Sequence, residues 1–299
     1  MEFHNGPLVR SPMTNNDKIA PPPAQLGLLL RLIGLCFLLM FVMGLLGGSL
    51  PRPIANTTLK LLQMATTLLL FGIPAFIYAR LSFPQNPLFH LGFRPAHRTN
   101  FYVLGILLLL FAFPLEGWLG LLNRQLPLPA WTIKAEDAAE QQLKALLVAK
   151  NSFDIVFNLV VVAIIPGIFE EMFFRGVVQR LLTRITRKPW LSICIAAAIF
   201  SFMHFEFLGF LPRFFLGILL GALFWYSGSL WTCVLAHCLF NGIQVLALNY
   251  MPEVMDNKNP SIPAYSVLLS LAIVIILLVV MRRQFLQWRA AEDNSLEWH

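Results

Sequence analysis

Two adjacent glutamates, Glu170 and Glu171, lie inside the apolar stretch Val160–Arg180. An ionisable side chain at membrane depth costs about 3 kcal/mol on insertion scales, so it is a candidate functional group. Glu171 and Arg175 are four residues apart, on one face of a helix, which predicts an ion pair that neutralises both charges. Glu170 points about 100° away and lacks that partner. We therefore expect Glu170 to be the group that does chemistry.

Two further apolar runs carry histidine. In one run Phe200 precedes His204 by one helical turn, and in another His237 precedes Asn241 by one turn. Counted from the predicted cytoplasmic ends at about 1.5 Å per residue, both imidazoles lie at a depth similar to that of Glu170. This predicts that the polar groups meet in one cavity open to the cytoplasmic half of the membrane.

Such a set of side chains suits the hydrolysis of an amide. A carboxylate with little water around it is a competent base toward a water molecule, and a histidine can share the proton. A second imidazole with an amide NH₂ can donate hydrogen bonds to the oxyanion. Alternatively, Glu170, His204 and His237 could hold Zn²⁺, which activates its bound water. Spacing does not choose between these two, and HExxH is absent.

Other protease chemistries find less support. No serine occurs in a GxSG-type setting, and no pair of aspartates lies within the apolar runs. Serine and aspartyl intramembrane proteolysis are therefore disfavoured.

The composition indicates a membrane protein. The chain is 58% hydrophobic and 12% charged, with a mean hydropathy of +0.70, which is too apolar for a soluble globular protein. The net charge of +7 comes from basic residues at the ends of apolar runs, so it indicates topology and not nucleic-acid binding. The four cysteines lie within apolar segments without CxxC spacing and are interpreted as packing residues.

The apolar runs predict an all-α polytopic protein with about eight transmembrane helices. We expect a disordered cytoplasmic tail over 1–25, N-terminal transmembrane helices and an external link over 26–152, a catalytic core over 153–250, and a final transmembrane helix with a cytoplasmic tail over 251–299. The predicted runs are Leu26–Leu50, Thr58–Tyr78, Phe101–Leu122, Phe153–Arg180, Trp190–Phe207, Phe210–Tyr226, Leu230–Tyr250 and Ala264–Met281.

The charged links predict the orientation of these helices. The links Arg80–Arg98 and Arg180–Lys188 and the tail from Arg282 are basic and fall on one side if the helices alternate. That side is predicted to be cytoplasmic, with both termini inside. Met251–Pro263 is not basic and fits an external loop. The external link Pro127–Asn151 predicts a short amphipathic helix on the membrane surface, with a gate over a cavity as the weaker alternative.

Three motifs together resemble a known family. Glu170–Gly176 matches EExxxRG, Phe200–His204 matches FxxxH, and His237–Asn241 matches HxxxN. Their order and spacing resemble the CPBP family of intramembrane endopeptidases, which comprises the type II CAAX prenyl proteases and the bacteriocin-processing, or Abi, proteins. The resemblance covers roughly Phe153–Ala247 and implies a role for each motif residue.

In that resemblance the general base is Glu170, assisted by His204, and the second acid is Glu171. Arg175 braces the acids, Phe200 lines the cavity, and the oxyanion is stabilised by His237 and Asn241. The family is commonly called a metalloprotease family, but a metal-free glutamate mechanism is also compatible with it. The metal ligands would be Glu170, His204 and His237.

We therefore expect an intramembrane endopeptidase that acts on a membrane-associated protein or peptide, in contact with the lipid bilayer. The compact loops and short tails are typical of a bacterial protein, which predicts the inner membrane as its location. A proton-coupled transporter is one alternative, although no internal repeat is evident. A non-catalytic immunity or binding protein is the other.

Overall fold

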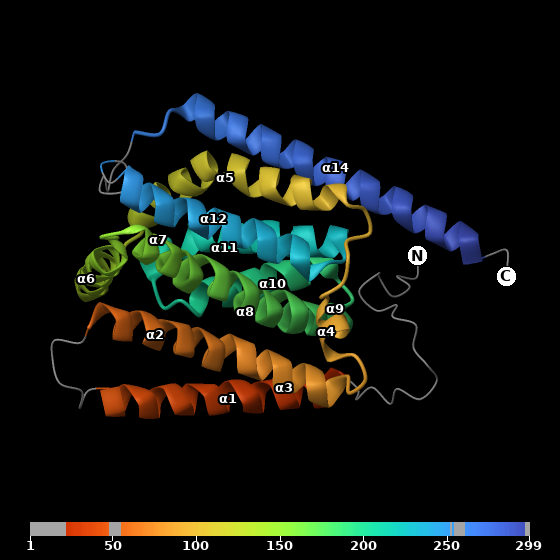
Figure 1. Cartoon of the computed structure of the whole chain (residues 1–299). Coiled ribbons are helices and arrows are strands. Elements are labelled where there is room, and N and C mark those ends of the chain that lie inside the picture. Colours follow the sequence, from red (N-terminus) through yellow and green to blue (C-terminus); the bar gives the residue numbers. More distant parts are fainter. Residues whose placement is uncertain (1–21, 48–54, 252, 254–260, 297–299) are drawn as a thin grey trace.

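The computed structural model describes residues 22–47, 55–251, 253 and 261–296 (Figure 1). Every regular element in these residues is a helix, so the predicted all-α class is confirmed. Residues 1–21 of the tail that is predicted to be disordered lie outside the described residues, and the rest of it begins the first helix.

Two groups of helices flank the stretch that carries the glutamates. Before it, α1 spans Pro22–Gly47, α2 Asn56–Thr67, the π-helix η1 Leu68–Gly72, α3 Ile73–Ser82, α4 Pro87–Leu91, α5 Asn100–Arg124 and α6 Ala130–Leu147. After it, α10 spans Pro189–Phe202, the 3-10 helix η4 Phe207–Gly209, α11 Phe210–Ser227, α12 Leu230–Tyr250 and α14 Ala264–Leu296.

One continuous helical stretch, Ser152–Thr186, carries both glutamates. It consists of α7 (Ser152–Asn158), the π-helix η2 (Leu159–Ile164), α8 (Ile165–Glu171), the π-helix η3 (Met172–Gln179) and α9 (Arg180–Thr186). Pro166 has no N–H, so it cannot close the i to i−4 hydrogen bond to the carbonyl of Val162 in η2. Wide π-helical turns are rare and often occur at functional sites. Both glutamates therefore lie in a short α-helix between two such segments.

Six of the eight predicted runs form helices that are long and apolar enough to cross a membrane. These six helices, which confirm a polytopic membrane protein, are Asn56–Ser82, Asn100–Arg124, Ser152–Thr186, Phe207–Ser227, Leu230–Tyr250 and Ala264–Glu292. Of the other two runs, the fifth forms the shorter apolar helix Pro189–Phe202, and in the first the apolar helix is described with its side chains over Pro23–Leu39 of α1. By length and composition, the described residues therefore support six spans of the predicted eight.

The fifth run ends earlier than predicted, because α10 stops at Phe202 and not at Phe207. A turn follows, in which Phe205 adopts a φ of 54°, a left-handed conformation through which an α-helix does not continue. His204 therefore lies in a turn after α10, and the prediction that it shares a helix with Phe200 is wrong. The last run continues further than predicted, since α14 extends to Leu296.

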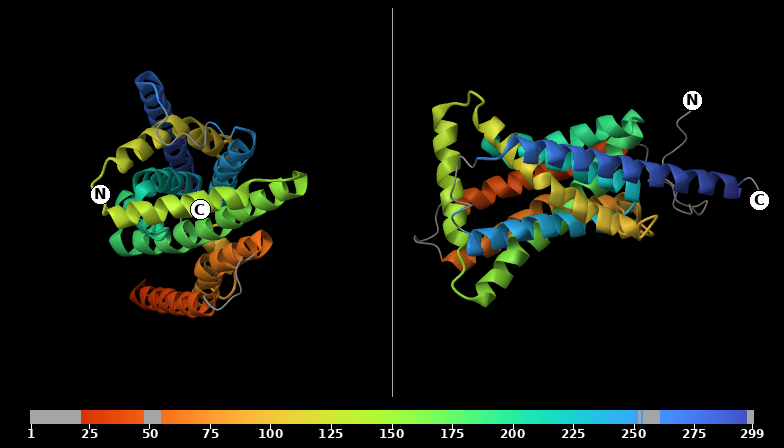
Figure 2. Two further views of the ribbon diagram at one scale, coloured as in Figure 1. Left: turned by 90° about the vertical axis from the view of Figure 1, so that its left-hand side faces the viewer. Right: turned by 90° about the horizontal axis from the view of Figure 1, so that it is seen from above.

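The long helices run along one common direction, and α6 crosses one end of the bundle transversely (Figures 1 and 2). The start of α1, the end of α14, and the basic links after α3 and α9 lie at the opposite end (Figure 1). Within the bundle, α14 packs along α5, and α10 packs against α11. The predicted helix in the link Pro127–Asn151 is thus present as α6.

Buried aromatic side chains connect the stretch Ser152–Thr186, called the glutamate helix below, to its neighbours. The ring of Phe174 in η3 contacts the ring of Phe71 in η1, with centroids 5.3 Å apart, and the ring of Phe200 in α10, with centroids 5.1 Å apart. All three rings are buried. This apolar packing fixes Phe200 beside the helix that carries the acids.

Candidate active site

Glu171 is the centre of a buried polar network. Its Oε1 atom lies 3.0 Å from Nη1 of Arg175 and 2.9 Å from Nδ1 of His237. All three side chains are buried, Glu171 completely, with 0% exposure. The ion pair predicted from the spacing of Glu171 and Arg175 is therefore present, and α12 adds a second partner that spacing alone does not indicate.

Arg175 is held by two further contacts. Its Nη2 donates to the carbonyl oxygen of Gly217 at 3.3 Å, and its guanidinium lies over the ring of Phe200, 4.9 Å from the centroid. One turn further along both helices, Gln179 donates to the carbonyl of Gly221 at 2.9 Å. Gly217 and Gly221 form a GxxxG pattern in α11, which allows close helix packing, and both offer their backbone carbonyls to the helix that carries the glutamates.

Glu170 has the opposite environment. Its side chain is 7% exposed, and within the described part of the chain it makes no hydrogen bond or ion pair. The prediction that Glu170 is left without the partner of Glu171 agrees with this geometry. A buried carboxylate without a partner is costly in a folded protein, so it is a strong candidate for a functional group.

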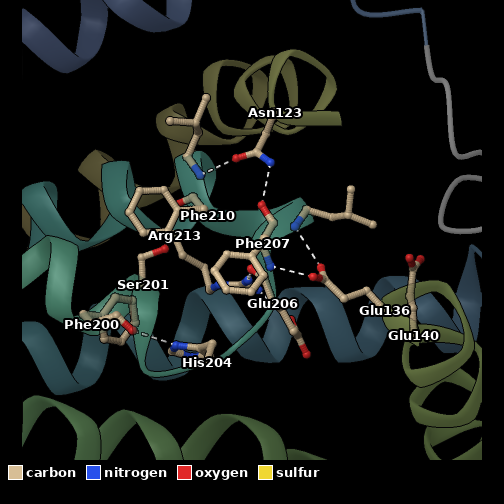
Figure 3. Close-up of polar contacts among 12 residues, drawn as sticks. Asn123, Glu136, Glu140, Phe200, Ser201, His204, Glu206, Phe207, Phe210 and Arg213 are labelled. Atoms are coloured by element: carbon tan, nitrogen blue, oxygen red, sulfur yellow. Dashed lines mark hydrogen bonds and ion pairs between the residues drawn. The ribbon is translucent and has the colours of Figure 1, made fainter. Parts of the chain in front are cut away.

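His204 lies beside the network and, like it, contacts the Phe200 ring. Its Nδ1 atom is 2.8 Å from the carbonyl oxygen of Phe200 (Figure 3), so in the neutral ring Nδ1 carries the hydrogen and Nε2 carries a lone pair. The Phe200 ring contacts both imidazoles, with centroid distances of 4.9 Å to His204 and 6.2 Å to His237. The structure therefore gathers the two histidines around Phe200.

Asn241 makes a bond to the backbone. Its Nδ2 donates to the carbonyl of Val162 at 3.1 Å, the same carbonyl to which Pro166 cannot donate. The amide NH₂ has a second hydrogen, so this bond leaves one N–H of Asn241 for another acceptor.

A glycine allows α8 and α12 to approach closely at this level. A β-carbon placed on Gly167 would lie 2.4 Å from Sγ of Cys238 and 3.2 Å from its backbone nitrogen. Only a residue without a side chain fits there, and the close contact brings Glu171 within hydrogen-bonding distance of His237. Cys238 is thereby a packing residue, as its apolar setting predicts.

The segment that holds this network matches a known protein family. Residues 152–243 match the family of Rce1-like type II CAAX prenyl endopeptidases. The matched segment contains every predicted site residue: Glu170, Glu171, Arg175, Phe200, His204, His237 and Asn241. It confirms the resemblance inferred from the three motifs. Neither curated proteins nor solved structures gave a significant match.

The proposed metal ligands of the Rce1-like segment do not converge on one point. Among the described residues, no three side chains of histidine, cysteine, aspartate or glutamate are close enough together to hold a metal ion. Nδ1 of His237 and Nδ1 of His204 contact Glu171 and the Phe200 carbonyl, so only Nε2 of each ring could face a metal. Because these groups do not come together, the described arrangement does not fit a zinc site.

An apolar cavity of about 440 Å³ lies on another face of the helical stretch Ser152–Thr186, which carries the glutamates. Ile168, Phe169 and Met172 line it from α8 and η3, together with Phe76 of α3 and Trp231 of α12. Neither glutamate lines this cavity. The polar network and the apolar cavity are therefore two separate spaces that share one helix.

Sequence reasoning missed the residues that hold the turn bearing His204. Asn123, at the end of α5, donates to the carbonyl of Phe207 and accepts from the N–H of Leu211, both at 2.7 Å. Glu136 of α6 binds the same segment (Figure 3). The available signal was a glutamate on an amphipathic helix, a pattern that normally indicates a face in water.

Proposed function

We propose that the chain is an intramembrane endopeptidase that hydrolyses a peptide bond of a membrane-associated protein or peptide. The observation that carries this proposal is the contrast between the two acids within the matched segment. Glu171 is bound by Arg175 and His237, whereas the buried Glu170 has no partner in the described residues. The carboxylate of Glu171 is thus engaged in structural contacts, and the carboxylate of Glu170 is available to activate water.

In this mechanism Glu170 is the general base. It takes a proton from a water molecule, and the water oxygen attacks the scissile carbonyl carbon. Nε2 of His204 has a lone pair in the neutral ring, so it can accept a hydrogen bond from the same water and orient it. The proton then passes to the leaving amine nitrogen as the carbon–nitrogen bond breaks.

His237 is the proposed donor to the oxyanion. Because its Nδ1–H is directed at Glu171, its Nε2 donates a hydrogen bond only when the ring is protonated. The second N–H of Asn241 is the proposed partner donor to the oxyanion.

The surroundings of the site support a substrate with an apolar segment. The Rce1-like segment lies among helices long and apolar enough to cross a membrane, and the apolar cavity beside α8 shares the helix of the glutamates. A membrane-associated peptide would reach both without leaving the bilayer.

The test is peptide cleavage by the purified protein in detergent or lipid nanodiscs, with a library of fluorogenic peptides. We expect cleavage by the wild type and a loss of at least about 100-fold with Glu170→Gln, which removes the base but keeps its shape. Full activity of Glu170→Gln would refute this assignment. A parallel series with chelator and with added Zn²⁺ tests the metal: a loss restored by Zn²⁺ would replace the metal-free scheme.

Two outcomes would favour the alternatives to an enzyme. Proton-dependent flux in proteoliposomes, without cleavage of any peptide, would indicate a transporter. An intact cellular phenotype in Glu170→Ala would indicate a binding or immunity protein that does no chemistry.

A further inference from the structure

The turn that carries His204 is held in an unfavourable backbone conformation. Phe205, the residue after His204, has a φ of 54°. A bulky residue rarely adopts this left-handed region, and it persists only where surrounding contacts hold it. Because the side chain of Phe205 is exposed, its own packing does not explain the conformation. The N–H of Phe205 donates to the carbonyl of Phe202 at 3.0 Å, and further restraint comes from the residues that follow Phe205.

Glu136 of α6 supplies part of that restraint, beside the bonds that Asn123 makes to Phe207 and Leu211 (Figure 3). Its Oε1 accepts the N–H of Phe207 and its Oε2 accepts the N–H of Leu208, both at 2.8 Å. These two N–H groups lie at the start of η4, directly before α11, where backbone donors have no partner within the helix. A carboxylate is favourable there because it also faces the positive end of the helix dipole. Glu136 and Asn123 together thus fix the point at which the chain leaves the His204 turn, and Glu136 binds the first two N–H groups of η4.

The helix that presents Glu136 is itself anchored to the bundle. Arg124 at the end of α5 donates to Glu140 at 3.1 Å, and the carbonyl of Leu147 accepts from Asn158 at 2.6 Å and from Asn249 at 3.3 Å. These contacts tie α6 to α5, α7 and α12. The helix crossing the end of the bundle is therefore a fixed support.

We propose that Glu136 is a positioning residue that holds His204 in its working orientation. This inference rests on the proposed peptidase function. When Glu136 binds the N–H groups of Phe207 and Leu208, Phe205 keeps its left-handed conformation. Nδ1 of His204 then keeps its hydrogen bond to the carbonyl of Phe200. That bond leaves Nε2 as the ring nitrogen that, in the proposed mechanism, orients the water activated by Glu170. Without the carboxylate, the turn relaxes and His204 moves relative to Glu170, although Glu136 itself touches no substrate.

The experiment compares Glu136→Gln with Glu140→Gln, two variants one turn apart on the same helix. A glutamine at 136 offers one acceptor in place of two, so one of the two N–H bonds is lost. At 140 the amide oxygen still accepts from Arg124. We expect Glu136→Gln to lower kcat about 10- to 100-fold with KM changed less than about twofold, the effect of a small misplacement of a catalytic group. Glu140→Gln should match the wild type.

Two further readouts separate positioning from general loosening of the fold. Hydrogen exchange at the amides of Phe207 and Leu208 should be faster in Glu136→Gln and unchanged in Glu140→Gln. The double variant Glu136→Gln/His204→Gln should be no slower than His204→Gln alone, because Glu136 acts through His204. If Glu136→Gln does not fold, Glu136→Asp, which keeps the charge on a shorter side chain, serves in the same comparisons with a smaller loss expected.

The outcomes distinguish a failure of the positioning role of Glu136 from a failure of the proposed peptidase function. Faster exchange with unchanged kcat would overturn the positioning role, as would unchanged exchange or an equal loss of kcat in Glu140→Gln. If Glu170→Gln is inactive while Glu136→Gln is fully active, the proposed function stands and this inference alone fails. If the wild type cleaves no peptide, the proposed function fails and the positioning role fails with it.

Discussion

Oε1 of Glu171 accepts a hydrogen bond from Nδ1 of His237 at 2.9 Å, although the two residues are 66 positions apart. The bond joins the glutamate helix to α12 through a carboxylate that is fully buried. Arg175 binds the same oxygen. Glu171 is therefore the group that connects the two helices and pairs with Arg175. Substitutions of Glu170 and Glu171 should for this reason have different effects.

Glu171→Gln is expected to destabilise the protein strongly. The substitution removes the charge that Arg175 and His237 share and leaves a buried guanidinium without its counter-ion. Breaking a buried ion pair from one side costs about 3–5 kcal/mol. The measurement is the free energy of unfolding in detergent, by denaturant titration, together with peptide cleavage, which should also be lost.

Glu170→Gln is the matched control on the neighbouring position. Because Glu170 has no ion pair or hydrogen bond in the described residues, neutralising it should leave the free energy of unfolding within about 1 kcal/mol of the wild type, or raise it. Cleavage should nevertheless be lost. Equal losses of stability in the two variants would contradict the division of roles.

Gly167→Ala is expected to separate the glutamate helix from α12. The added β-carbon would lie 2.4 Å from Sγ of Cys238, so the helices must move apart. Overpacking of this kind costs about 1–3 kcal/mol. Since the same contact sets the distance from Glu171 to His237, kcat should fall with stability. Unfolding titrations and cleavage assays check both effects.

Gly120→Ala provides the control for this prediction. A β-carbon at Gly120 in α5 meets nothing within 4 Å, so alanine there should be neutral or stabilising by up to about 1 kcal/mol. Adding Cys238→Ala to Gly167→Ala should restore stability only in part, because the backbone nitrogen of residue 238 remains 3.2 Å from the new β-carbon. Full restoration would place the clash on the sulfur alone.

The sequence predicts contacts within one helix better than contacts between helices. Glu171 and Arg175 pair because they are four residues apart, and a local rule suffices. The partner of Glu171 on α12 depends on how Gly167 lets two helices approach, which no periodicity encodes. The three motifs predict that Glu170, His204 and His237 lie in one site. They do not specify that His237 binds Glu171 or that His204 binds the carbonyl of Phe200.

The end of α10 shows a second limit of sequence reasoning. Phe205 and Phe207 continue the apolar pattern beyond Phe202, so composition predicts a longer helix. The chain turns after Phe202, where Glu136, 71 residues before Phe207, accepts the N–H of Phe207 and Asn123 donates to its carbonyl. The amphipathic pattern does predict the helix that bears Glu136, but assigns its polar face to water. A long-range backbone contact of this kind leaves no periodic signal.

Asn241→Leu is expected to destabilise the glutamate helix. The variant leaves the carbonyl of Val162 without the N–H of Asn241, and Pro166 has no N–H to replace it. An unsatisfied buried carbonyl costs about 1–3 kcal/mol. In a Pro166→Ala background the backbone N–H returns, so the same substitution should cost less. Denaturant titration of the four proteins in this double-mutant cycle gives the coupling.

Cleavage rates in the same four proteins test the second role of Asn241. If its other N–H binds the oxyanion, kcat should remain low in Asn241→Leu/Pro166→Ala even where stability is restored. Recovery of both quantities together would show that Asn241 only supports the helix.

His97 is expected to make the stability of the fold depend on pH. It lies in the link before α5, where its ring stacks on Trp288 of α14 with centroids 3.6 Å apart and its backbone N–H donates to the carbonyl of Ser227 at 3.0 Å. Burial, and secondly the nearby charge of Arg94, lower the pKa of His97 from 6.5 to about 4. His97 is therefore neutral in the folded protein at pH 7.

The sign of the effect follows from proton binding by the two states. Between the pKa of about 6.5 in the unfolded chain and about 4 in the fold, the unfolded chain binds a proton that the folded chain does not, so stability falls as pH falls through this window. His97→Phe keeps a ring to stack on Trp288 but does not titrate. Unfolding free energies measured from pH 7.5 to 4.5 should therefore decline more steeply in the wild type than in His97→Phe, and parallel curves would show that His97 is not the group responsible.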